Sequence, residues 1–266
     1  MIALVINLAR APERWASMAR QAAERGLAID RVEAVDGHDP AALAASGAAP
    51  DSGLRPGEIA CFESHRAAWR RIAEGDAPFG LVLEDDVFLG PALPKVLAGL
   101  PAAAEGLDIV KLNAHPRGML VHTLPLARVG GRALVRPAQG TSDSSAYVIS
   151  RSFAGRALAI HVGYTQPLDL ALFDTATCPA IAQLDPAITI QQRYADFRFL
   201  DEVAPKTSIQ PDKAATARPR VHPLAAVRSE AARVWRRRVI PAAQPLLNLG
   251  RAPEDRQDFR RIAFDG

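Results

Sequence analysis

The chain has 266 residues, of which 48% are hydrophobic and 23% are charged, and its net charge is +3. This length suits one large domain, or one domain with an appendage, and the apolar content supplies a full core. A globally disordered chain is therefore excluded.

Two cysteines, Cys61 and Cys178, are too few for a disulfide framework and lack the spacing of a metal site. We therefore expect reduced thiols in a cytoplasmic protein. The apolar N-terminal run is too short for a signal peptide, and no basic segment precedes it. No apolar run reaches about 18 residues, so we expect no membrane-spanning helix.

Along residues 1–112, apolar runs alternate with helical patterns, which predicts an α/β fold with mostly parallel strands. Pro12 suits the first turn of a helix, and Gly26 suits its end. The predicted strands are 2–8, 29–35, 79–83 and 108–112, and the predicted helices are 12–25, 57–74 and about 91–100. Further on, we expect a hairpin over 118–137 around Gly130-Gly131, a strand over 146–149 and a helix over 151–161.

The composition changes beyond Pro205. Residues 206–266 contain 13 Lys and Arg against 6 Asp and Glu, a net charge of +7, whereas residues 1–205 carry −4. Pro205 precedes this segment, Pro211, Pro219 and Pro223 interrupt its start, and a basic helix is predicted over 224–239. We therefore predict a main domain over 1–210 and a basic, proline-interrupted helical extension over 211–266.

The run Glu84-Asp85-Asp86 follows an apolar strand and precedes another apolar residue. Adjacent carboxylates repel one another, and their oxygens suit hard cations such as Mg²⁺ and Mn²⁺. Acids at the carboxyl end of a buried strand also lie where open α/β sheets bind ligands. The run indicates a metal site that holds a nucleotide diphosphate; the alternative is a solvated turn without an ion.

Two other groups are candidates for binding. Asn7, Arg10 and Arg14 follow the first strand, where an arginine would pair with a pyrophosphate; the alternative is a pair of ordinary surface arginines. Glu58 and His65 share one face of the helix over 57–74 with Cys61, beside its core-facing stripe. That face would border a substrate cleft, unless His65 merely satisfies Glu58 or a backbone carbonyl.

The polar stretch over 139–147 suits hydroxyl-rich ligands, or it is an ordinary polar loop. Asp169 lies at a predicted helix start, where an acid often interacts with the helix dipole. The chain has no Gly-x-Gly-x-x-Gly and no Walker-type loop, which argues against a dinucleotide-dependent oxidoreductase and a P-loop kinase.

Several short motifs occur in one order along residues 1–210. They are Val5-Ile6-Asn7-Leu8 with Arg10 and Arg14, Gly57-Glu58-Ile59-Ala60-Cys61 with Ser64-His65, Leu83-Glu84-Asp85-Asp86-Val87, Gly140-Thr141 with Ala146-Tyr147-Val148-Ile149-Ser150, Pro167 with Asp169, and the later Gln191 and Ser208-Ile209. Together they resemble the bacterial family 25 glycosyltransferases of the lipooligosaccharide or lipopolysaccharide biosynthesis type. Residues after about 212 lie outside the resemblance.

The resemblance implies a GT-A-like, Rossmann-type fold with a mostly parallel central sheet flanked by helices. It implies an inverting transfer of a sugar from a nucleotide-sugar, most often UDP-linked, to a hydroxyl of a glycan or lipid-linked glycan. In this family, an acidic motif at the place of residues 84–86 holds Mn²⁺ or Mg²⁺, which neutralises the diphosphate leaving group.

The resemblance also implies residue roles. Asp86 would be the main metal ligand, and Glu84 and Asp85 would assist with the metal or the donor ribose. Asp169 would be the general base on the acceptor hydroxyl, with Asp143 as the alternate. The remaining residues are His65 and Glu58 at the cleft wall, and Asn7 and Arg14 toward the nucleotide.

The run Asp143-Ser144-Ser145 looks longer and more polar than the family pattern, so acceptor preference is expected to differ. Two alternatives are a nucleotidyltransferase and a non-catalytic protein whose tail contacts a membrane or partner. We expect residues 212–266 to contact the cytoplasmic face of the inner membrane, where each basic residue adds roughly 1 kcal/mol; the alternative is a solvated helix. Nucleic acid is not an expected partner, because aromatic interleaving is missing.

Overall fold

The computed structural model describes residues 1–114, 118–195 and 240–265. Its strands are β1 (Ile2–Asn7), β2 (Asp30–Glu33), β3 (Phe79–Glu84), β4 (Val87–Leu89), β5 (Ile109–Lys111), β6 (Met119–Val129), β7 (Arg132–Pro137), β8 (Ala146–Ser150), β9 (Ile181–Asp185), β10 (Thr189–Gln191) and β11 (Gln257–Arg260). Its α-helices are α1 (Pro12–Glu24), α2 (Pro40–Ala44), α3 (Pro56–Glu74), α4 (Leu93–Ala103), α5 (Arg151–Ile160), α6 (Leu168–Leu172) and α8 (Ile240–Leu247). Short 3₁₀ turns are η1 (Gln192–Tyr194) and η4 (Pro253–Asp255).

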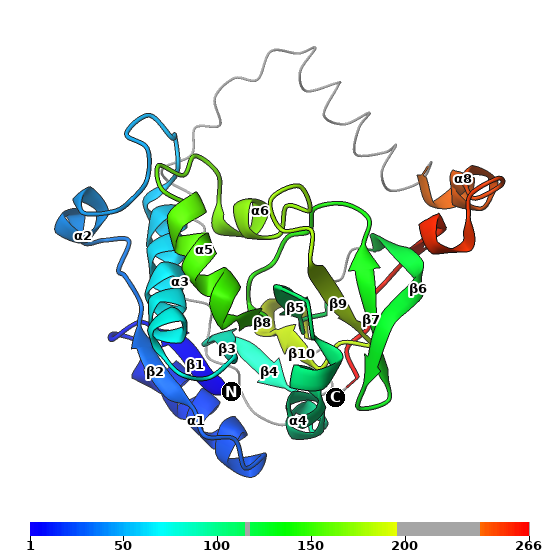
Figure 1. Cartoon of the computed structure of the whole chain (residues 1–266). Coiled ribbons are helices and arrows are strands. Elements are labelled where there is room, and N and C mark those ends of the chain that lie inside the picture. The colour runs from blue at the N-terminus through cyan, green and yellow to red at the C-terminus, as the bar shows by residue number, and fades with distance from the viewer. Residues whose placement is uncertain (115–117, 196–239, 266) are drawn as a thin grey trace.

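Nine strands form one mixed sheet in the order β11-β6-β7-β9-β5-β8-β3-β1-β2 (Figure 1). Strands β2, β1 and β3 are parallel neighbours, and β5 and β9 form a second parallel pair. Strand β8 lies between these groups and is antiparallel to both β3 and β5. The predicted α/β class is confirmed, and the strands predicted within residues 1–112 all run in one direction. The remaining strands β7, β6 and β11 add an antiparallel extension.

Helices cover both faces of the sheet. Alternate residues of β1 point to opposite faces, so Leu4 packs with α3, α5 and α6 while Val5 packs with α1 and α4. A strand that is buried on both faces must be apolar throughout, which explains the continuous apolar run that starts the chain. Gly80 lets α3 approach β3, because a Cβ there would collide with Ile72.

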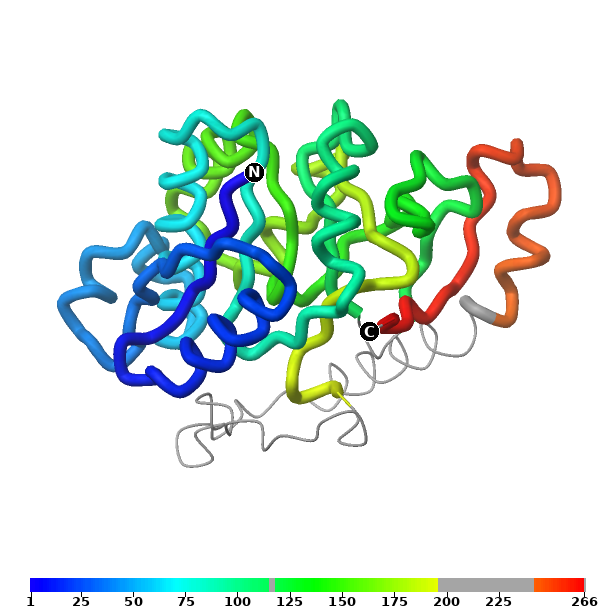
Figure 2. Tube along the Cα trace, turned by 90° about the horizontal axis from the view of Figure 1, so that it is seen from below, coloured from blue at the N-terminus to red at the C-terminus, as the bar shows by residue number. Residues whose placement is uncertain are grey.

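Residues 257–265 return to the sheet, so this part of the extension predicted over 211–266 packs against the main domain. Strand β11 pairs with β6, and Phe259 covers Gly118, where a larger side chain would collide with its ring. Ile262 packs with Ala114, and Figure 2 shows this last segment running beside β6. The physical reason is that β6 would otherwise leave an open sheet edge. The basic helix predicted over 224–239 lies outside the described residues.

The strand ends set the position of the site. The parallel register aligns Ile6 of β1 with Glu84 of β3, so both strands end at the same edge of the sheet. Strand β4 follows at once and pairs antiparallel with β10. Among the described residues, no helix has the length and apolar character needed to cross a membrane.

Candidate active site

The three acids at the end of β3 divide into two groups, with Glu84 as the last residue of the strand and Asp85 and Asp86 in the turn before β4. Asp85 points toward β1 and α1. Its carboxylate accepts hydrogen bonds from Asn7 Nδ2 at 2.7 Å and from Arg14 Nη1 at 2.7 Å. Burial raises the pKa of Asp85, while the charge of Arg14 opposes that rise. The structure thus joins three predicted donor-binding residues in one buried ion-paired group.

That group leaves polar atoms without protein partners. Among the described residues, nothing hydrogen-bonds to Arg14 Nε, Arg14 Nη2 or Asn7 Oδ1, although all three atoms are buried. Unpaired buried donors are costly, so their presence at a strand end favours a polar ligand there.

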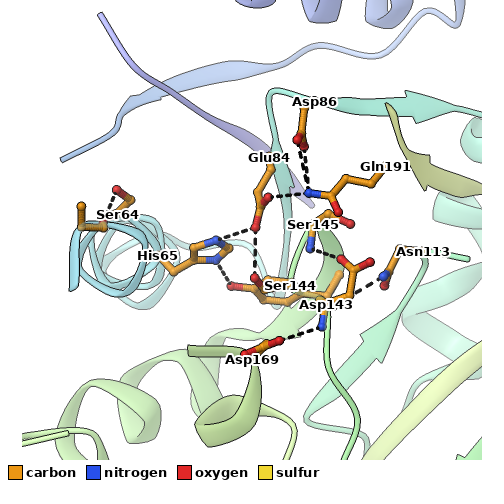
Figure 3. Close-up of polar contacts among 12 residues, drawn as sticks. Ser64, His65, Glu84, Asp86, Asn113, Asp143, Ser144, Ser145, Asp169 and Gln191 are labelled. Atoms are coloured by element: carbon orange, nitrogen blue, oxygen red, sulfur yellow. Dashed lines mark hydrogen bonds and ion pairs between the residues drawn. The ribbon is translucent and has the colours of Figure 1, made fainter. Parts of the chain in front are cut away.

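Glu84 and Asp86 point to the other side and converge on Gln191 (Figure 3). The Nε2 of Gln191 lies 3.3 Å from Glu84 Oε2 and 3.2 Å from each carboxylate oxygen of Asp86. The pairing of Gln191 with Val87 and the bond from Gln192 N to Asp86 O, 2.7 Å long, fix this approach. The two carboxylates therefore lie close together, around the amide nitrogen of Gln191.

The two carboxylates differ in protonation. Burial, followed by the charge of Glu84, raises the pKa of Asp86 to about 7. Burial also acts to raise the pKa of Glu84, but the adjacent His65 ring and the hydroxyl of Ser144 outweigh it and hold that pKa below its ordinary value. A bound divalent cation would remove the repulsion between them. Carboxylate oxygens with a nearby amide are a donor set that fits Mn²⁺ or Mg²⁺.

A chain of hydrogen bonds runs from the core to His65, whose other ring nitrogen faces Glu84. Trp69 Nε1 donates to the hydroxyl of Tyr147 at 2.7 Å, and that hydroxyl lies 2.8 Å from His65 Nδ1. Indole N–H only donates, so the tyrosine proton is free to point at Nδ1. In the neutral imidazole the proton is then on Nε2, which lies 3.6 Å from Glu84 Oε1. Ser144 Oγ donates to the same oxygen at 3.0 Å, so Oε1 is fixed while Oε2 remains toward Asp86.

Cys61 also lies in this region. Single ligand atoms of Cys61, His65 and Glu84 lie within 4.8 Å of one another, a set that zinc accepts. However, burial and then the charge of Glu84 raise the pKa of the Cys61 thiol well above its ordinary value. Without a bound cation the thiol therefore stays protonated, and His65 Nε2 faces Glu84.

The structure does not bring Glu58 to His65. Glu58 occupies the third position of α3, where its Oε2 accepts from Arg55 N at 2.9 Å and its Oε1 from Arg55 Nη2 at 2.7 Å. A glutamate at this position satisfies the open N–H groups of a helix start. The expected place of Glu58 at the cleft wall has no support in these contacts, and its position is explained by helix capping.

The two candidate bases lie together below Glu84 (Figure 3). Asp169 Oδ2 accepts from the backbone N–H of Asp143 at 3.2 Å. Asp143 has a φ of 76°, which is unusual for any residue but glycine, and its Oδ1 accepts from Ser145 N at 3.0 Å. Its Oδ2 is buried and has no hydrogen-bond partner among the described residues. Backbone strain of this kind concentrates at functional sites.

A buried lysine holds the loop that carries Asp143. Lys111 Nζ donates to Thr141 Oγ1 at 3.1 Å and to Ser142 O at 2.5 Å, and it lies 4.0 Å from the centre of the Phe173 ring. Burial lowers the pKa of Lys111 to about 8, against the attraction of Asp143. These contacts tie this loop to β5, at the centre of the sheet.

An open hollow of about 450 Å³ lies at the carboxyl ends of β1 and β2. Arg10 lines it and pairs with Asp36 across it, and Glu33 and Asp39 contribute further acids. Arg10 thus lies beside a ligand-sized hollow, apart from the group that contains Arg14 and Asp85.

Sequence reasoning did not assign a role to Gln191, Tyr147 or Trp69. Gln191 and Tyr147 occur in the motifs that carry the family resemblance, but only the fold shows that they contact Glu84 and His65. The sequence pattern indicates that Trp69 is an ordinary core residue of α3. A tyrosine and a tryptophan within buried elements usually need a polar partner, which was the available signal.

This chain is similar in sequence to a known protein family and to members of it. The profile of glycosyltransferase family 25 (LPS biosynthesis protein) matches residues 1–170. The lacto-N-neotetraose biosynthesis glycosyltransferase LgtB of Neisseria gonorrhoeae is 29% identical over 210 residues, covering 73% of this chain and 75% of the relative. LgtB of Neisseria meningitidis serogroup B is 30% identical over 211 residues, covering 73% and 76%.

A more distant relative is the lipooligosaccharide biosynthesis protein lic2B of Haemophilus influenzae, 27% identical over 149 residues that cover 52% of this chain and 55% of the relative. Among solved structures, the inositol-1-phosphate CTP transferase from T. maritima has a TM-score of 0.34 and 10% identity, covering 71% of this chain and 68% of that one. The family profile spans more than half of the chain and includes the acid run, His65 and Asp169. The chain therefore belongs to glycosyltransferase family 25 and is a glycosyltransferase.

Proposed function

We propose that this protein transfers a sugar from a UDP-sugar to a hydroxyl of a glycan or lipid-linked glycan, with Mn²⁺ or Mg²⁺ and with inversion at the anomeric carbon. The observation that carries the proposal is the convergence of Glu84 and Asp86 on one point at the end of β3. Ligands of open α/β sheets bind at this edge, and a GT-A-like arrangement of donor and metal fits it.

The donor would bind along the ends of β1 and β3. The hollow beside Arg10 is large enough for a nucleoside, and its acids Glu33 and Asp36 suit ribose hydroxyls. The unpaired N–H groups of Arg14 lie next to Asp85 and suit a phosphate oxygen. Arg193 is exposed, and its charge reaches Glu84, so it is a second cation for the diphosphate.

The metal would be held by Asp86 and Glu84. When bound, it would neutralise the diphosphate and so stabilise the leaving group. His65 and Ser144 orient Glu84, and Asn7 and Arg14 keep Asp85 out of the ligand set.

Asp169 is the proposed general base, and Asp143 is the alternate. The acceptor oxygen attacks the anomeric carbon while the bond from that carbon to the diphosphate oxygen breaks, so UDP leaves with the electron pair. The hydroxyl proton passes to the carboxylate of Asp169. Asp169 is half-buried and is held by the Asp143 N–H, so it is both accessible and oriented.

The relatives support a lipopolysaccharide-type acceptor. The family is described as an LPS biosynthesis protein family, and LgtB is named for lacto-N-neotetraose biosynthesis. Family membership also favours a glycosyltransferase over the two alternatives, a nucleotidyltransferase and a non-catalytic tether.

A thermal-shift panel tests the donor class. UDP, GDP, CMP and CTP are each added with and without Mn²⁺. UDP with Mn²⁺ should raise Tm by on the order of 5 °C at about 100 times its Kd, and neither component alone should match that shift. A shift that needs CTP, with release of pyrophosphate on turnover, would favour the nucleotidyltransferase. The absence of a shift with every nucleotide would favour the tether.

We further propose that the C-terminal region contacts the cytoplasmic face of the inner membrane, where a lipid-linked acceptor would lie. Residues 206–239 contain nine Lys and Arg against two Asp and Glu, and α8 follows directly. At the end of α8, Leu246 and Leu249 are 69% and 75% exposed and Leu247 is 51% exposed. Basic residues next to exposed leucines suit an anionic bilayer surface.

The leucines give a direct test with vesicles of anionic lipid. Replacing Leu246, Leu247 and Leu249 together with Ser should weaken vesicle binding by about tenfold or more, because apolar burial in the interface is lost. The matched control replaces Leu124 and Leu126, exposed leucines of β6, with Ser. Equal sedimentation of both variants and wild type with the vesicles would refute the proposed membrane contact.

A further inference from the structure

The side-chain amide of Gln191 occupies the position that a cation would take between the two acids. Its Nε2 contacts Glu84 Oε2 and both carboxylate oxygens of Asp86 within 3.3 Å. An N–H donor relieves the repulsion between two carboxylates, so the amide takes over part of a cation's role. Figure 3 shows Gln191 reaching into this position from β10, with the acids on the facing segment.

The other end of the same amide is not satisfied. Gln191 Oε1 is buried and has no hydrogen-bond partner among the described residues, while Gln191 as a whole is 6% exposed. A buried acceptor without a donor is unfavourable, and native proteins rarely retain one without a ligand or water. The unused atom is a neutral oxygen, a type that Mn²⁺ and Mg²⁺ accept.

A bound cation would change which end of the amide is favoured. The N–H groups would then face a positive charge, and a half-turn of the amide exchanges Nε2 with Oε1 without moving the backbone. The backbone has little freedom to move, because β10 pairs with β4 and Gln192 N holds Asp86 O. After the half-turn, three oxygens from Glu84, Asp86 and Gln191 would surround one point.

We propose that Gln191 is a third metal ligand that donates to Glu84 and Asp86 in the metal-free protein and turns its amide to present Oε1 when the metal binds. This inference rests on the metal-dependent function proposed above. It assigns the end of β10, which lies after the family-matched region, to the metal site.

The change Gln191→Leu tests whether Gln191 is a metal ligand or only a hydrogen-bond donor, because the two roles predict opposite changes in Mn²⁺ affinity. If Gln191 only donates to the acids, its removal frees them, and Mn²⁺ affinity remains the same or rises. If Gln191 is a ligand, Mn²⁺ affinity falls by about 10- to 100-fold, the loss that supporting groups of metal sites produce. The affinity is measured by titration calorimetry of full-length protein with Mn²⁺, with and without UDP.

Two further variants complete the test. Gln191→Glu supplies an oxygen in the same place, so it should retain or tighten Mn²⁺ binding, while the added repulsion lowers the metal-free Tm. Gln192→Leu removes a neighbouring amide whose Oε1 is also buried without a partner among the described residues, and it should leave Mn²⁺ affinity unchanged. Circular dichroism verifies the fold of each variant.

The outcomes distinguish this inference from the proposed function. Wild type that does not bind Mn²⁺, even with UDP, would overturn both. Wild type that binds Mn²⁺, with Gln191→Leu binding equally well or more tightly, would overturn only the role of Gln191. Weaker binding in Gln191→Leu, together with binding retained in Gln191→Glu and Gln192→Leu, is the expected result.

Discussion

Replacing Asp86 with Asn should abolish the Tm shift that UDP and Mn²⁺ produce together, and should lower kcat/KM by about 10³-fold, equivalent to about 4 kcal/mol. The reason is that Asn removes the charge of the proposed main metal ligand but keeps its size. Thermal shift measures the binding loss, and a transfer assay measures the catalytic loss.

The same variant should alter the pH dependence of stability without metal. The pKa of Asp86 is raised from 3.8 to about 7 in the fold, so the native state binds more protons than the unfolded state between these values. The stability of metal-free wild type should therefore fall as the pH rises from about 4 to about 7. Asp86→Asn should reduce this fall. An unchanged UDP and Mn²⁺ shift in the variant would refute the metal assignment.

Replacing Asp169 with Asn should lower kcat by about 10²- to 10⁴-fold, the usual contribution of a general base, while binding of UDP with Mn²⁺ remains unchanged. The physical reason is that Asn keeps the hydrogen bond from Asp143 N but does not accept the acceptor's proton. Kinetics with saturating acceptor give kcat, and the thermal shift reports binding.

Two variants control for this result. Asp174→Asn changes an acid a few residues further along the chain and should retain activity. Asp143→Asn tests the alternate base, and Asn tolerates the positive φ at this position. Activity that survives in Asp169→Asn and disappears in Asp143→Asn would transfer the role to Asp143.

Much of the main sheet was predictable, because strands that are buried on both faces are apolar throughout. The parallel strands that end at Asn7 and Glu84 were expected from their apolar runs. The division of the acid run was not predictable, because Asp85 and Asp86 lie in a turn, where strand alternation does not apply. Only the contacts of Asp85 with Asn7 and Arg14 separate it from Glu84 and Asp86.

The rest depends on contacts between distant parts of the chain. Gln191 reaches Glu84 across 107 positions, and no local pattern connects them. Glu58 shares a helix face with His65, but capping of α3 by Glu58 competes with any role at the cleft. The return of residues 257–260 to the sheet could not be predicted from the sequence either, because a charged edge strand lacks the apolar run that marks a central strand.

The most direct test of the account is a transfer assay with a panel of UDP-sugars and truncated lipooligosaccharide acceptors, with Mn²⁺ or with EDTA. Mass spectrometry detects the added sugar, and NMR of the product gives its anomeric configuration. The account predicts transfer that requires the metal and a product whose anomeric configuration is opposite to that of the donor. Transfer that persists in EDTA, or a product that retains the donor configuration, would contradict it.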